Sequence, residues 1–360
     1  MNHSSKIYVA GHTGLVGSAI VRKLQDSGYK NLVVRTHREL DLTRQSEVES
    51  FFEEEKPEFV FLAAAMVGGI LANNTYKADF IYQNIVIAAN VIHASYKYGV
   101  KKLLNLGSSC IYPKFAPQPM TEEYLLTGSL EPTNEPYAIA KISAIKLCRY
   151  FNEQYGTNFI SVMPANLYGL NDNFDLETSH VLPALIRKMH LGKCLQNGDF
   201  DSVRKDLTRY PIRDHNVIHL KDEEIVNLLS KFGIKSNYPK NSQLPTIVEV
   251  WGSGTPSREF LHADDLADAC IFLMRDHNAQ DIGEFVNIGT GKELKIKELA
   301  EIIKEIVGFE GKIQWDTSKP DGTPRKLLSI EKINRLGWKA KIDFTEGLKL
   351  VYKDYVSKHD

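Results

Sequence analysis

The first 170 residues alternate short apolar runs with segments of helical periodicity. The apolar runs, which have the length and composition of strands, lie at 6–10, 31–36, 58–64, 102–109 and 159–169. The helical segments between them lie at 15–27, 46–55, 76–98 and 136–155. Strands that are apolar on both faces and joined by helices are typical of a parallel sheet covered on both sides. The pattern therefore predicts an α/β fold with a Rossmann-type, doubly wound parallel sheet.

Beyond residue 170 the alternation weakens. Strand-like runs remain at 248–252, 285–289 and 312–316, and helical segments at 292–308 and 344–356. We expect a Rossmann domain over 1–170, to which returning segments near 248–268 contribute. We expect 171–360 to form mainly a smaller mixed α/β lobe that binds the substrate.

Residues 193–247 have the composition of an inserted segment, being polar and rich in turn-forming residues. Within it, apolar residues recur at helical spacing, and Gly233 follows as a helix stop. These apolar residues are Ile225, Leu228, Leu229 and Phe232. The segment is either a helix that covers an edge of the fold, or a substrate lid or partner contact.

Composition excludes several classes of protein. The formal net charge is −1, which favours neither nucleic acid nor an anionic membrane as a partner. No apolar run approaches the roughly 20 residues that span a bilayer, and the N-terminus enters a strand without a signal peptide, so we expect a cytoplasmic location. The cysteines Cys110, Cys148, Cys194 and Cys270 lack the spacing of a zinc site or a disulfide framework, and we expect no metal.

A glycine-rich loop follows the first strand and precedes the first helix. Gly11 allows the tight turn, Gly14 lets a pyrophosphate approach backbone N–H groups, and Gly17 lets the helix pack on the strand. The spacing is GxxGxxG, and its place between a strand and a helix indicates a dinucleotide site. The residues expected to contact the cofactor here are Gly11, His12, Thr13, Gly14, Leu15, Val16 and Gly17.

The second strand ends in a basic turn containing Arg35, His37 and Arg38. Enzymes that use NAD usually place an acid here to bind the ribose 2′-hydroxyl, whereas a cation suits the 2′-phosphate of NADP. The turn therefore predicts NADP(H) as cofactor. Asp41 and Leu42 are expected to flank the adenine.

Tyr137 and Lys141 are four residues apart at the start of a predicted helix, which puts phenol and ammonium on one face. The ammonium is expected to lower the pKa of Tyr137, making it a proton donor to a carbonyl under reduction. Ser108 lies at the carboxyl end of the fourth predicted strand, where doubly wound sheets place their sites. Together with the glycine loop, the three residues form a specific set that predicts reduction of a carbonyl by a dinucleotide cofactor.

Long stretches of the chain are more specific to one family than these general motifs. They include AGHTGLVGSAI, LGSSCIYP, LEPTNEPYAIAKI, SHVLPALIRK, VWGSGTP–REFLH and SKPDGTPRK. In these stretches, and over nearly all of the chain outside 193–247, the sequence resembles the GDP-L-fucose synthase family of extended short-chain dehydrogenases/reductases. The resemblance implies conversion of GDP-4-keto-6-deoxy-D-mannose to GDP-L-fucose by C3/C5 epimerisation and then NADPH-dependent reduction at C4. It also implies a homodimer formed through the helices at 76–98 and 136–155.

The resemblance implies that Cys110 and His180 are the acid–base pair of the epimerisation, with Cys110 as base. Cys110 is two residues after Ser108, so the two side chains point the same way along an extended segment. A base, an acid on the opposite face and a stabilised enolate oxygen are what inversion beside a ketone requires. Lys141 is expected to contact the nicotinamide ribose as well.

Two further sets of residues follow from the resemblance. The expected contacts to the guanosine diphosphate end of the substrate are Lys188, Trp251, Arg258, Asp321 and Lys326. The other expected contacts to the cofactor are Leu106, Gly107, Ser109, Pro164, Asn166 and Leu167. Arg258 suits a phosphate best, because guanidinium matches phosphate geometry.

The chain departs from the family pattern at four positions, Thr13, His37, Met66 and Leu170, of which the last two border the sugar site. One alternative is therefore a C4 reductase of a GDP-4-keto-6-deoxy-heptose, with or without epimerisation. A second is a cofactor-sensing protein without activity, against which the intact Ser108, Tyr137 and Lys141 count. A third is a nucleotide-sugar 4,6-dehydratase, which usually has an acid where this chain has Ser109 and Cys110.

Overall fold

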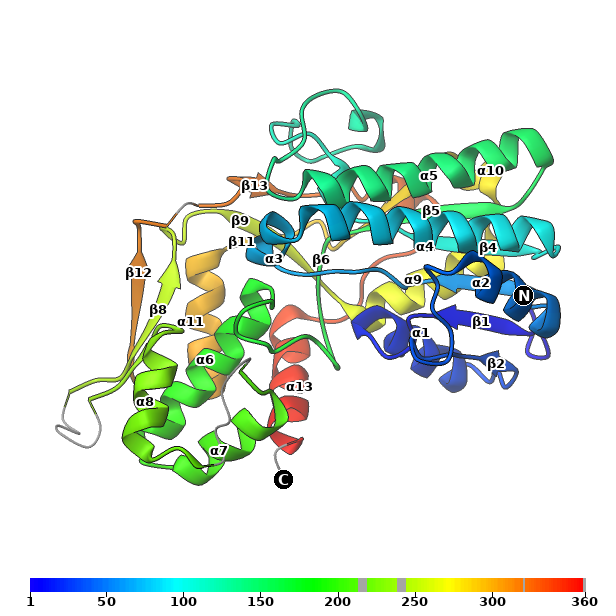
Figure 1. Cartoon of the computed structure of the whole chain (residues 1–360). Coiled ribbons are helices and arrows are strands. Elements are labelled where there is room, and N and C mark those ends of the chain that lie inside the picture. The colour runs from blue at the N-terminus through cyan, green and yellow to red at the C-terminus, as the bar shows by residue number, and fades with distance from the viewer. Residues whose placement is uncertain (213–218, 238–243, 320, 359–360) are drawn as a thin grey trace. The chain divides into compact units, whose positions relative to one another are not determined.

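The computed structural model describes residues 1–212, 219–237, 244–319 and 321–358 (Figure 1). Parts of the segment 193–247 therefore lie outside the described residues. The chain forms two compact units and passes between them several times. Unit 1 consists of Met1–Asn171, Glu259–Lys292 and Lys326–Ile342, and unit 2 of Asp172–Arg258, Glu293–Arg325 and Asp343–Asp360.

Unit 1 contains a six-stranded sheet in which every neighbouring pair is parallel. Its order is β10-β5-β4-β3-β1-β2. The strands are β1 (Ile7–Ala10), β2 (Leu32–Val33), β3 (Phe59–Leu62), β4 (Lys102–Leu106), β5 (Phe159–Pro164) and β10 (Val286–Ile288). Successive strands run outward from β1 in both directions, so the order reverses beside β1, where doubly wound sheets bind their ligands. The predicted Rossmann-type fold is confirmed.

The helices of unit 1 include all four that the sequence predicts in this region, namely α1 (Leu15–Asp26), α2 (Gln45–Glu55), α4 (Lys77–Lys97) and α5 (Glu135–Tyr155). Four shorter or later helices are α3 (Ile70–Thr75), α9 (Ala263–Asp276), α10 (Ala279–Ile282) and α12 (Glu331–Arg335), and 3-10 turns cover Ser109–Ile111 and Glu122–Tyr124. Within unit 1, α4 packs along α5 and α1 packs along α9 (Figure 1).

The strands bury both faces, which explains their unbroken apolar sequences. In β1, Ile7 and Val9 point into a core shared with α1 and α9, whereas Tyr8 and Ala10 point into a core shared with α2, α4 and α5. All four residues are essentially inaccessible to solvent. Alternate side chains thus enter opposite layers, as the period of two along a strand requires.

The run predicted as one strand over 159–169 is divided in two. After β5 the amide of Ala165 still donates to Ile288 in β10 at 2.9 Å. The chain then leaves the main sheet as β6 (Asn166–Tyr168), which pairs in parallel with the later part of β9 (Ser257–His262). The sequence analysis did not predict this split, because it depends on the pairing of β6 with the distant β9.

Unit 2 contains a three-stranded sheet of order β12-β8-β7, in which β12 (Lys312–Asp316) and β8 (Ile247–Trp251) are parallel and β7 (Ile234–Lys235) is antiparallel to β8. Its helices are α6 (Val181–Gln196), α7 (Phe200–Arg209), α8 (Asp222–Ser230), α11 (Ile296–Val307) and α13 (Phe344–Ser357). The short strands β11 (Glu293–Lys295) and β13 (Arg325–Lys326) complete the described elements.

The inserted segment contributes two helices to a core of its own. The helix predicted from residues 225–232 is α8, and Gly233 follows it with φ +79°. The helix α7 was not predicted, although Phe200, Val203 and Leu207 recur at helical spacing. Apolar side chains of α6, α7 and α8 bury one another in one cluster, so these helices are structural parts of unit 2. Among the described residues, no helix is both long and apolar enough to cross a membrane.

Candidate active site

The glycine loop has the backbone that a bound pyrophosphate needs. Gly11 adopts φ +80°, and a Cβ there would lie 2.8 Å from the amide nitrogen of Ala64. A Cβ on Gly17 would lie 2.1 Å from the carbonyl oxygen of Gly11, so α1 approaches the turn as closely as only glycine allows. Gly14 is the N-cap residue of α1 and no side chain caps it. Backbone N–H groups at this end of α1 are therefore available to an anion.

The remaining loop residues divide into buried and exposed positions. Nδ1 of His12 is buried and makes no hydrogen bond with any described residue. Thr13 is exposed, whereas Leu15 and Val16 are half-buried and pack on the core of unit 1. A buried ring nitrogen without a partner is rare in a folded protein. It indicates that the loop is built to receive a polar ligand.

The basic side chains in the turn after β2 differ in the contacts that they make. Arg35 pairs with Glu55 at 2.5 Å and lies over the ring of Phe51 at 5.5 Å. Arg38 is exposed and makes no ion pair or hydrogen bond with any described residue. His37 is exposed, 3.9 Å from a carboxylate oxygen of Asp41. Arg38 is thus the cation of this turn that remains available to a 2′-phosphate.

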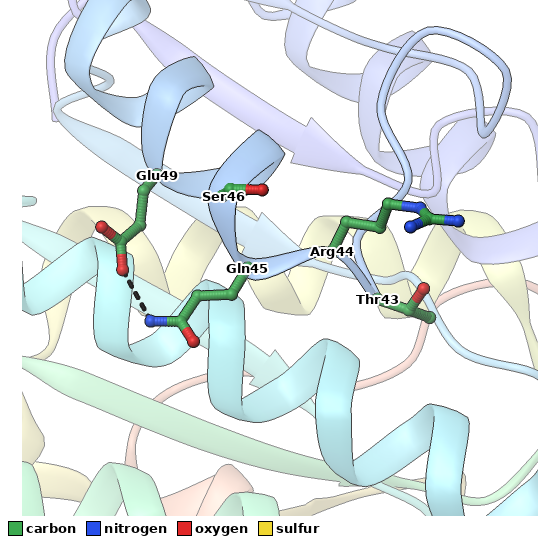
Figure 2. A pocket seen from close by; sticks show the side chains of 5 residues that line it. All are labelled: Thr43, Arg44, Gln45, Ser46 and Glu49. Carbon is green, nitrogen blue, oxygen red and sulfur yellow. Dashed lines mark hydrogen bonds between the residues drawn. The ribbon is translucent and has the colours of Figure 1, made fainter.

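Asp41 and Leu42 were predicted to flank the adenine. Asp41 accepts hydrogen bonds from the backbone and hydroxyl of Thr43, at 3.0 and 2.7 Å, which lower its pKa. Leu42 is buried. Figure 2 shows a surface pocket just beyond them, at the start of α2, where Gln45 donates a hydrogen bond to Glu49 at 2.8 Å. None of the predicted site residues lines this pocket.

Ser108, Tyr137 and Lys141 lie close together in unit 1. Lys141 is buried, donates to the carbonyl of Leu106 at 2.8 Å, and lies 5.7 Å from the ring centre of Tyr137. Tyr137 and Ser108 are hydrogen-bonded to each other. The fourth strand and the first turns of α5 thus bring phenol, hydroxyl and ammonium together at the carboxyl edge of the sheet.

The predicted lowering of the pKa of Tyr137 is wrong for this structure. Burial raises the pKa of the phenol well above its ordinary value, the charge of Cys110 raises it further, and only the hydrogen bond with Ser108 opposes them. Burial also lowers the pKa of Lys141 to about 8.

The sulfur of Cys110 accepts two hydrogen bonds. The side-chain amide of Asn134 donates to Sγ at 3.2 Å, and Nζ of Lys326 donates at 3.8 Å. Cys110 is half-buried, in contrast to Cys148, Cys194 and Cys270, which are buried. The amide of Cys110 donates to the hydroxyl of Ser108 at 3.3 Å, which ties the thiol to the three residues above.

Asn134 is a site residue that the sequence analysis missed. It is the N-cap residue of α5, but its side chain makes no capping hydrogen bond. An asparagine at this position normally accepts from the first turn of the helix. An asparagine that begins a helix three residues before the tyrosine was the available signal, yet it indicates a cap as readily as a site residue.

The other predicted cofactor contacts surround the ends of β4 and β5. Leu106, Gly107 and Ser109 are buried, and a Cβ on Gly107 would lie 2.0 Å from Met163. Asn166 donates to the carbonyl of Glu259 at 2.8 Å, which holds β6 against β9. Pro164 is the last residue of β5, and Leu167 is half-buried in β6.

Of the predicted substrate residues, four lie in unit 2 and Lys326 lies in unit 1. Nζ of Lys188 donates to the carbonyl of Glu249 at 3.2 Å, and burial lowers its pKa to about 8. Arg258 is half-buried, and its guanidinium donates to the carbonyl of Ser257 at 2.7 Å.

Trp251 and Asp321 lie close together in unit 2. The indole of Trp251 is 57% exposed, with Nζ of Lys319 at 5.4 Å from the ring centre. Asp321 accepts hydrogen bonds from the backbone and hydroxyl of Ser253, at 2.8 and 2.7 Å. Trp251 is the last residue of β8, and Asp321 holds the turn that follows it.

His180, also in unit 2, is the N-cap residue of α6 and is exposed, and its side chain does not cap the helix. It follows a loop that contains Asp172, whose Oδ2 is buried without a hydrogen bond to any described residue. Burial raises the pKa of Asp172 to about 7. The described residues contain no group of three or more His, Cys, Asp or Glu able to hold a metal ion.

Comparison with known proteins agrees with this geometry. The model of the NAD dependent epimerase/dehydratase family matches residues 7–208 and 237–289. GDP-L-fucose synthase 1 of Arabidopsis thaliana is 55% identical, over 98% of this chain and 94% of that protein. GDP-L-fucose synthase of Escherichia coli is 46% identical, over 99% of this chain and 98% of that protein.

A solved structure is similar over the whole length as well. It is a GDP-D-glycero-L-gluco-heptose synthase from Campylobacter jejuni in the presence of NADPH, with 42% identity, a TM-score of 0.88 and 99% of both chains covered. Identity with both proteins named GDP-L-fucose synthase is higher than with this one. The chain belongs to the NAD dependent epimerase/dehydratase family and, within it, to the GDP-L-fucose synthases.

Proposed function

We propose that this enzyme converts GDP-4-keto-6-deoxy-D-mannose to GDP-L-fucose, by epimerisation at C3 and C5 followed by reduction at C4 with NADPH. The observation that carries the proposal is the cluster in unit 1 that joins Ser108, Tyr137 and Lys141 to the half-buried thiol of Cys110. The first three residues suit the reduction of a carbonyl. A thiol directly beside them suits removal of a proton from the carbon next to that carbonyl.

Unit 1 fits an NADP(H) cofactor. Gly11 permits the tight turn and Gly17 the close packing of α1, Gly14 leaves its backbone N–H open to a pyrophosphate, and the N-terminus of α1 suits the negative charge. The unpartnered ring nitrogen of His12 and the exposed guanidinium of Arg38 are suited to polar groups of the cofactor. Lys141 is suited to the nicotinamide ribose. The cofactor supplies the hydride that C4 of the sugar receives.

In the epimerisation, Cys110 as thiolate takes a proton from C3 or C5 and the electron pair passes to the C4 oxygen. Ser108 and Tyr137 donate hydrogen bonds to the enolate oxygen that results. His180 returns a proton to the opposite face of the same carbon, and the enolate electrons reform the carbonyl. In the reduction, the phenol of Tyr137 gives its proton to the C4 oxygen, which becomes a hydroxyl.

Burial of Tyr137 suits this role. A phenol with a raised pKa stays protonated at neutral pH and keeps its proton until the C4 oxygen becomes basic. Lys141 then carries the positive charge that balances the phenolate.

We propose that unit 2 holds the guanosine diphosphate. The exposed indole of Trp251 suits the guanine face, and Asp321 holds the turn that follows this tryptophan. Arg258 and Lys188 are suited to the phosphates. The inserted segment supports this unit by packing α7 and α8 on α6.

A homodimer in the cytoplasm completes the proposal. Large aromatic side chains on α4 and α5 are exposed in the single chain, which is unusual unless another surface covers them. They are Tyr82, Tyr96, Tyr150 and Tyr155. Light scattering after gel filtration should give twice the chain mass, and a monomer would contradict this part.

The test of function is incubation with GDP-4-keto-6-deoxy-D-mannose and NADPH, with oxidation followed by absorbance and the product sugar identified by NMR. Fast turnover to GDP-L-fucose is expected. No turnover of this sugar, with fast turnover of the corresponding heptose, would replace the proposal by the heptose reductase. No turnover of either sugar would contradict both.

A further inference from the structure

Lys326, which is not among the predicted catalytic residues, contacts Cys110. We propose that Lys326 is a positioning residue that holds the Cys110 sulfur as a thiolate, ready to accept a proton, during epimerisation. The inference rests on the proposed function and concerns the same site. Sequence resemblance alone implied that Lys326 contacts the guanosine diphosphate.

The direction of the hydrogen bonds favours an anionic sulfur. Sγ of Cys110 accepts from Asn134 at 3.2 Å and from Lys326 at 3.8 Å. No described residue accepts a hydrogen bond from this thiol. An ammonium ion at this distance attracts a thiolate more strongly than a neutral thiol, whose sulfur is only a weak acceptor. The two donors at Sγ therefore suit a sulfur that acts as a base.

Backbone contacts fix the segment that carries Lys326. The amide of Leu327 donates to the side chain of Gln118 at 2.8 Å, and its carbonyl accepts from Met120 at 2.8 Å. The amide of Ser329 in turn donates to the carbonyl of Met120 at 2.8 Å. Three hydrogen bonds thus hold residues 327–329 against the segment 118–120.

A buried carboxylate anchors the same segment from the other side. Glu259 is 1% exposed and accepts from the amide of Leu328 at 2.9 Å. It also accepts from the amides of Thr290 and Gly291, at 2.6 and 2.7 Å. Fixing the backbone two residues from Lys326 reduces the freedom of its side chain and the entropy lost when it contacts Cys110.

The charge of Lys326 is available to the sulfur. Lys326 is half-buried and forms no ion pair with any described carboxylate. Arg325, its neighbour in β13, instead pairs with Glu293 at 2.7 Å. The two adjacent cations therefore have different partners, and Arg325 provides a matched control.

In each inversion the C–H bond of the sugar breaks, its proton passes to Sγ, and its electron pair passes to the C4 oxygen. Lys326 neither gains nor loses a proton. Its positive charge lowers the energy of the thiolate before the transfer.

The experiment compares Lys326→Met, Lys326→Arg and Arg325→Met with the wild-type enzyme by two measurements. The first is the rate of alkylation by iodoacetamide, with Cys110→Ser as background, because the other three cysteines are buried. The second is exchange of solvent deuterium into C3 and C5 of GDP-4-keto-6-deoxy-D-mannose at saturating concentration. Loss of a cation within about 4–6 Å of an anion changes the population of that anion about tenfold or more.

We expect Lys326→Met to lower both rates about tenfold or more. We expect Lys326→Arg to restore most of the loss and Arg325→Met to behave as wild type. Wild-type rates in Lys326→Met would overturn the inference. A change confined to KM would also overturn it, and would indicate that Lys326 contacts the guanosine diphosphate. A melting curve checks folding, and Lys326→Gln replaces the methionine variant if that variant is unfolded.

The two proposals fail in different ways. If the wild-type enzyme exchanges no deuterium into any keto-sugar, the proposed function fails. The alkylation rates would still test whether Lys326 increases the reactivity of the Cys110 sulfur. If the wild-type enzyme exchanges deuterium and Lys326→Met matches it, the function stands and the inference about Lys326 fails.

Discussion

The side chain of Asn134 donates a hydrogen bond to Sγ of Cys110 at 3.2 Å, although Asn134 stands where it would normally cap α5. The side chain of Asn134 therefore hydrogen-bonds the thiol and does not cap the helix. The helix begins without this cap, since Pro136 occupies its first turn, where a missing N–H costs nothing.

Replacing Asn134 tests that division of roles. Asn134→Ser supplies a good cap that is too short to reach the sulfur, so we expect the melting temperature to stay the same or rise. Deuterium exchange at C3 and C5 should fall about tenfold, as expected for loss of a hydrogen bond to a charged group. Unchanged exchange, measured by NMR, would remove Asn134 from the mechanism.

Substitution of Gly17 should affect folding, whereas substitution of Gly14 should affect cofactor binding. A Cβ on Gly17 would lie 2.1 Å from the carbonyl oxygen of Gly11, whereas a Cβ on Gly14 would lie at an ordinary 3.6 Å. Gly17→Ala should destabilise the fold by about 1–3 kcal/mol in urea unfolding. Gly14→Ala should keep its stability and weaken NADPH binding in fluorescence titration. Equal stability of the two variants would contradict the reading of the loop.

Substitution of Arg38 and substitution of Arg35 should have different effects on the preference of the enzyme for NADPH over NADH. Because Arg35 is paired with Glu55 and Arg38 is not paired, Arg38→Ala should weaken NADPH binding about tenfold, as for loss of one charge-assisted hydrogen bond. Its effect on NADH should be small. Arg35→Ala should chiefly lower stability. If Arg35→Ala alone removed the preference for NADPH, the roles of the two residues would be reversed.

Asp172 should make stability depend on pH. Its pKa is raised to about 7 by burial, above the value near 4 of an unfolded chain, so the folded protein binds more protons between these values. Stability should therefore fall as pH rises from about 4 through 7. Asp172→Asn should remove that slope and stabilise the fold above pH 7, by on the order of 1–2 kcal/mol. A slope that persists in the variant, in urea titrations across this range, would assign it to other groups.

The sequence predicted the main sheet because both faces of its strands are buried. Ile7 to Ala10 alternate between two cores, and such strands have continuous apolar sequences that can be read directly. The division of 159–169 into β5 and β6 was not readable, since it depends on pairing with β9, about 90 residues later in the chain. Pairing at such a distance leaves no local pattern.

The site was predictable where residues act at short spacing in sequence. Tyr137 and Lys141 share a helix face. Ser108 and Cys110 are near neighbours, but the expected extended segment is wrong, because Ser109–Ile111 forms a 3-10 turn that Ser108 caps. The contact of Lys326 with Cys110 joins residues 216 positions apart and needs the anchors at Glu259 and Met120. The pKa of Tyr137 was mispredicted for a related reason, because spacing gives the neighbour of a phenol but not its burial.

The most direct test is whether epimerisation requires the thiol of Cys110 and reduction requires the phenol of Tyr137. Cys110→Ser and Tyr137→Phe would be incubated with NADPH and GDP-4-keto-6-deoxy-D-mannose in deuterated water, and the deuterium at C3 and C5 and the oxidation of NADPH measured together. We expect Cys110→Ser to lose deuterium incorporation while still binding NADPH, and Tyr137→Phe to fold normally and lose NADPH oxidation. Normal deuterium incorporation in Cys110→Ser, or a wild-type rate of oxidation in Tyr137→Phe, would contradict the account.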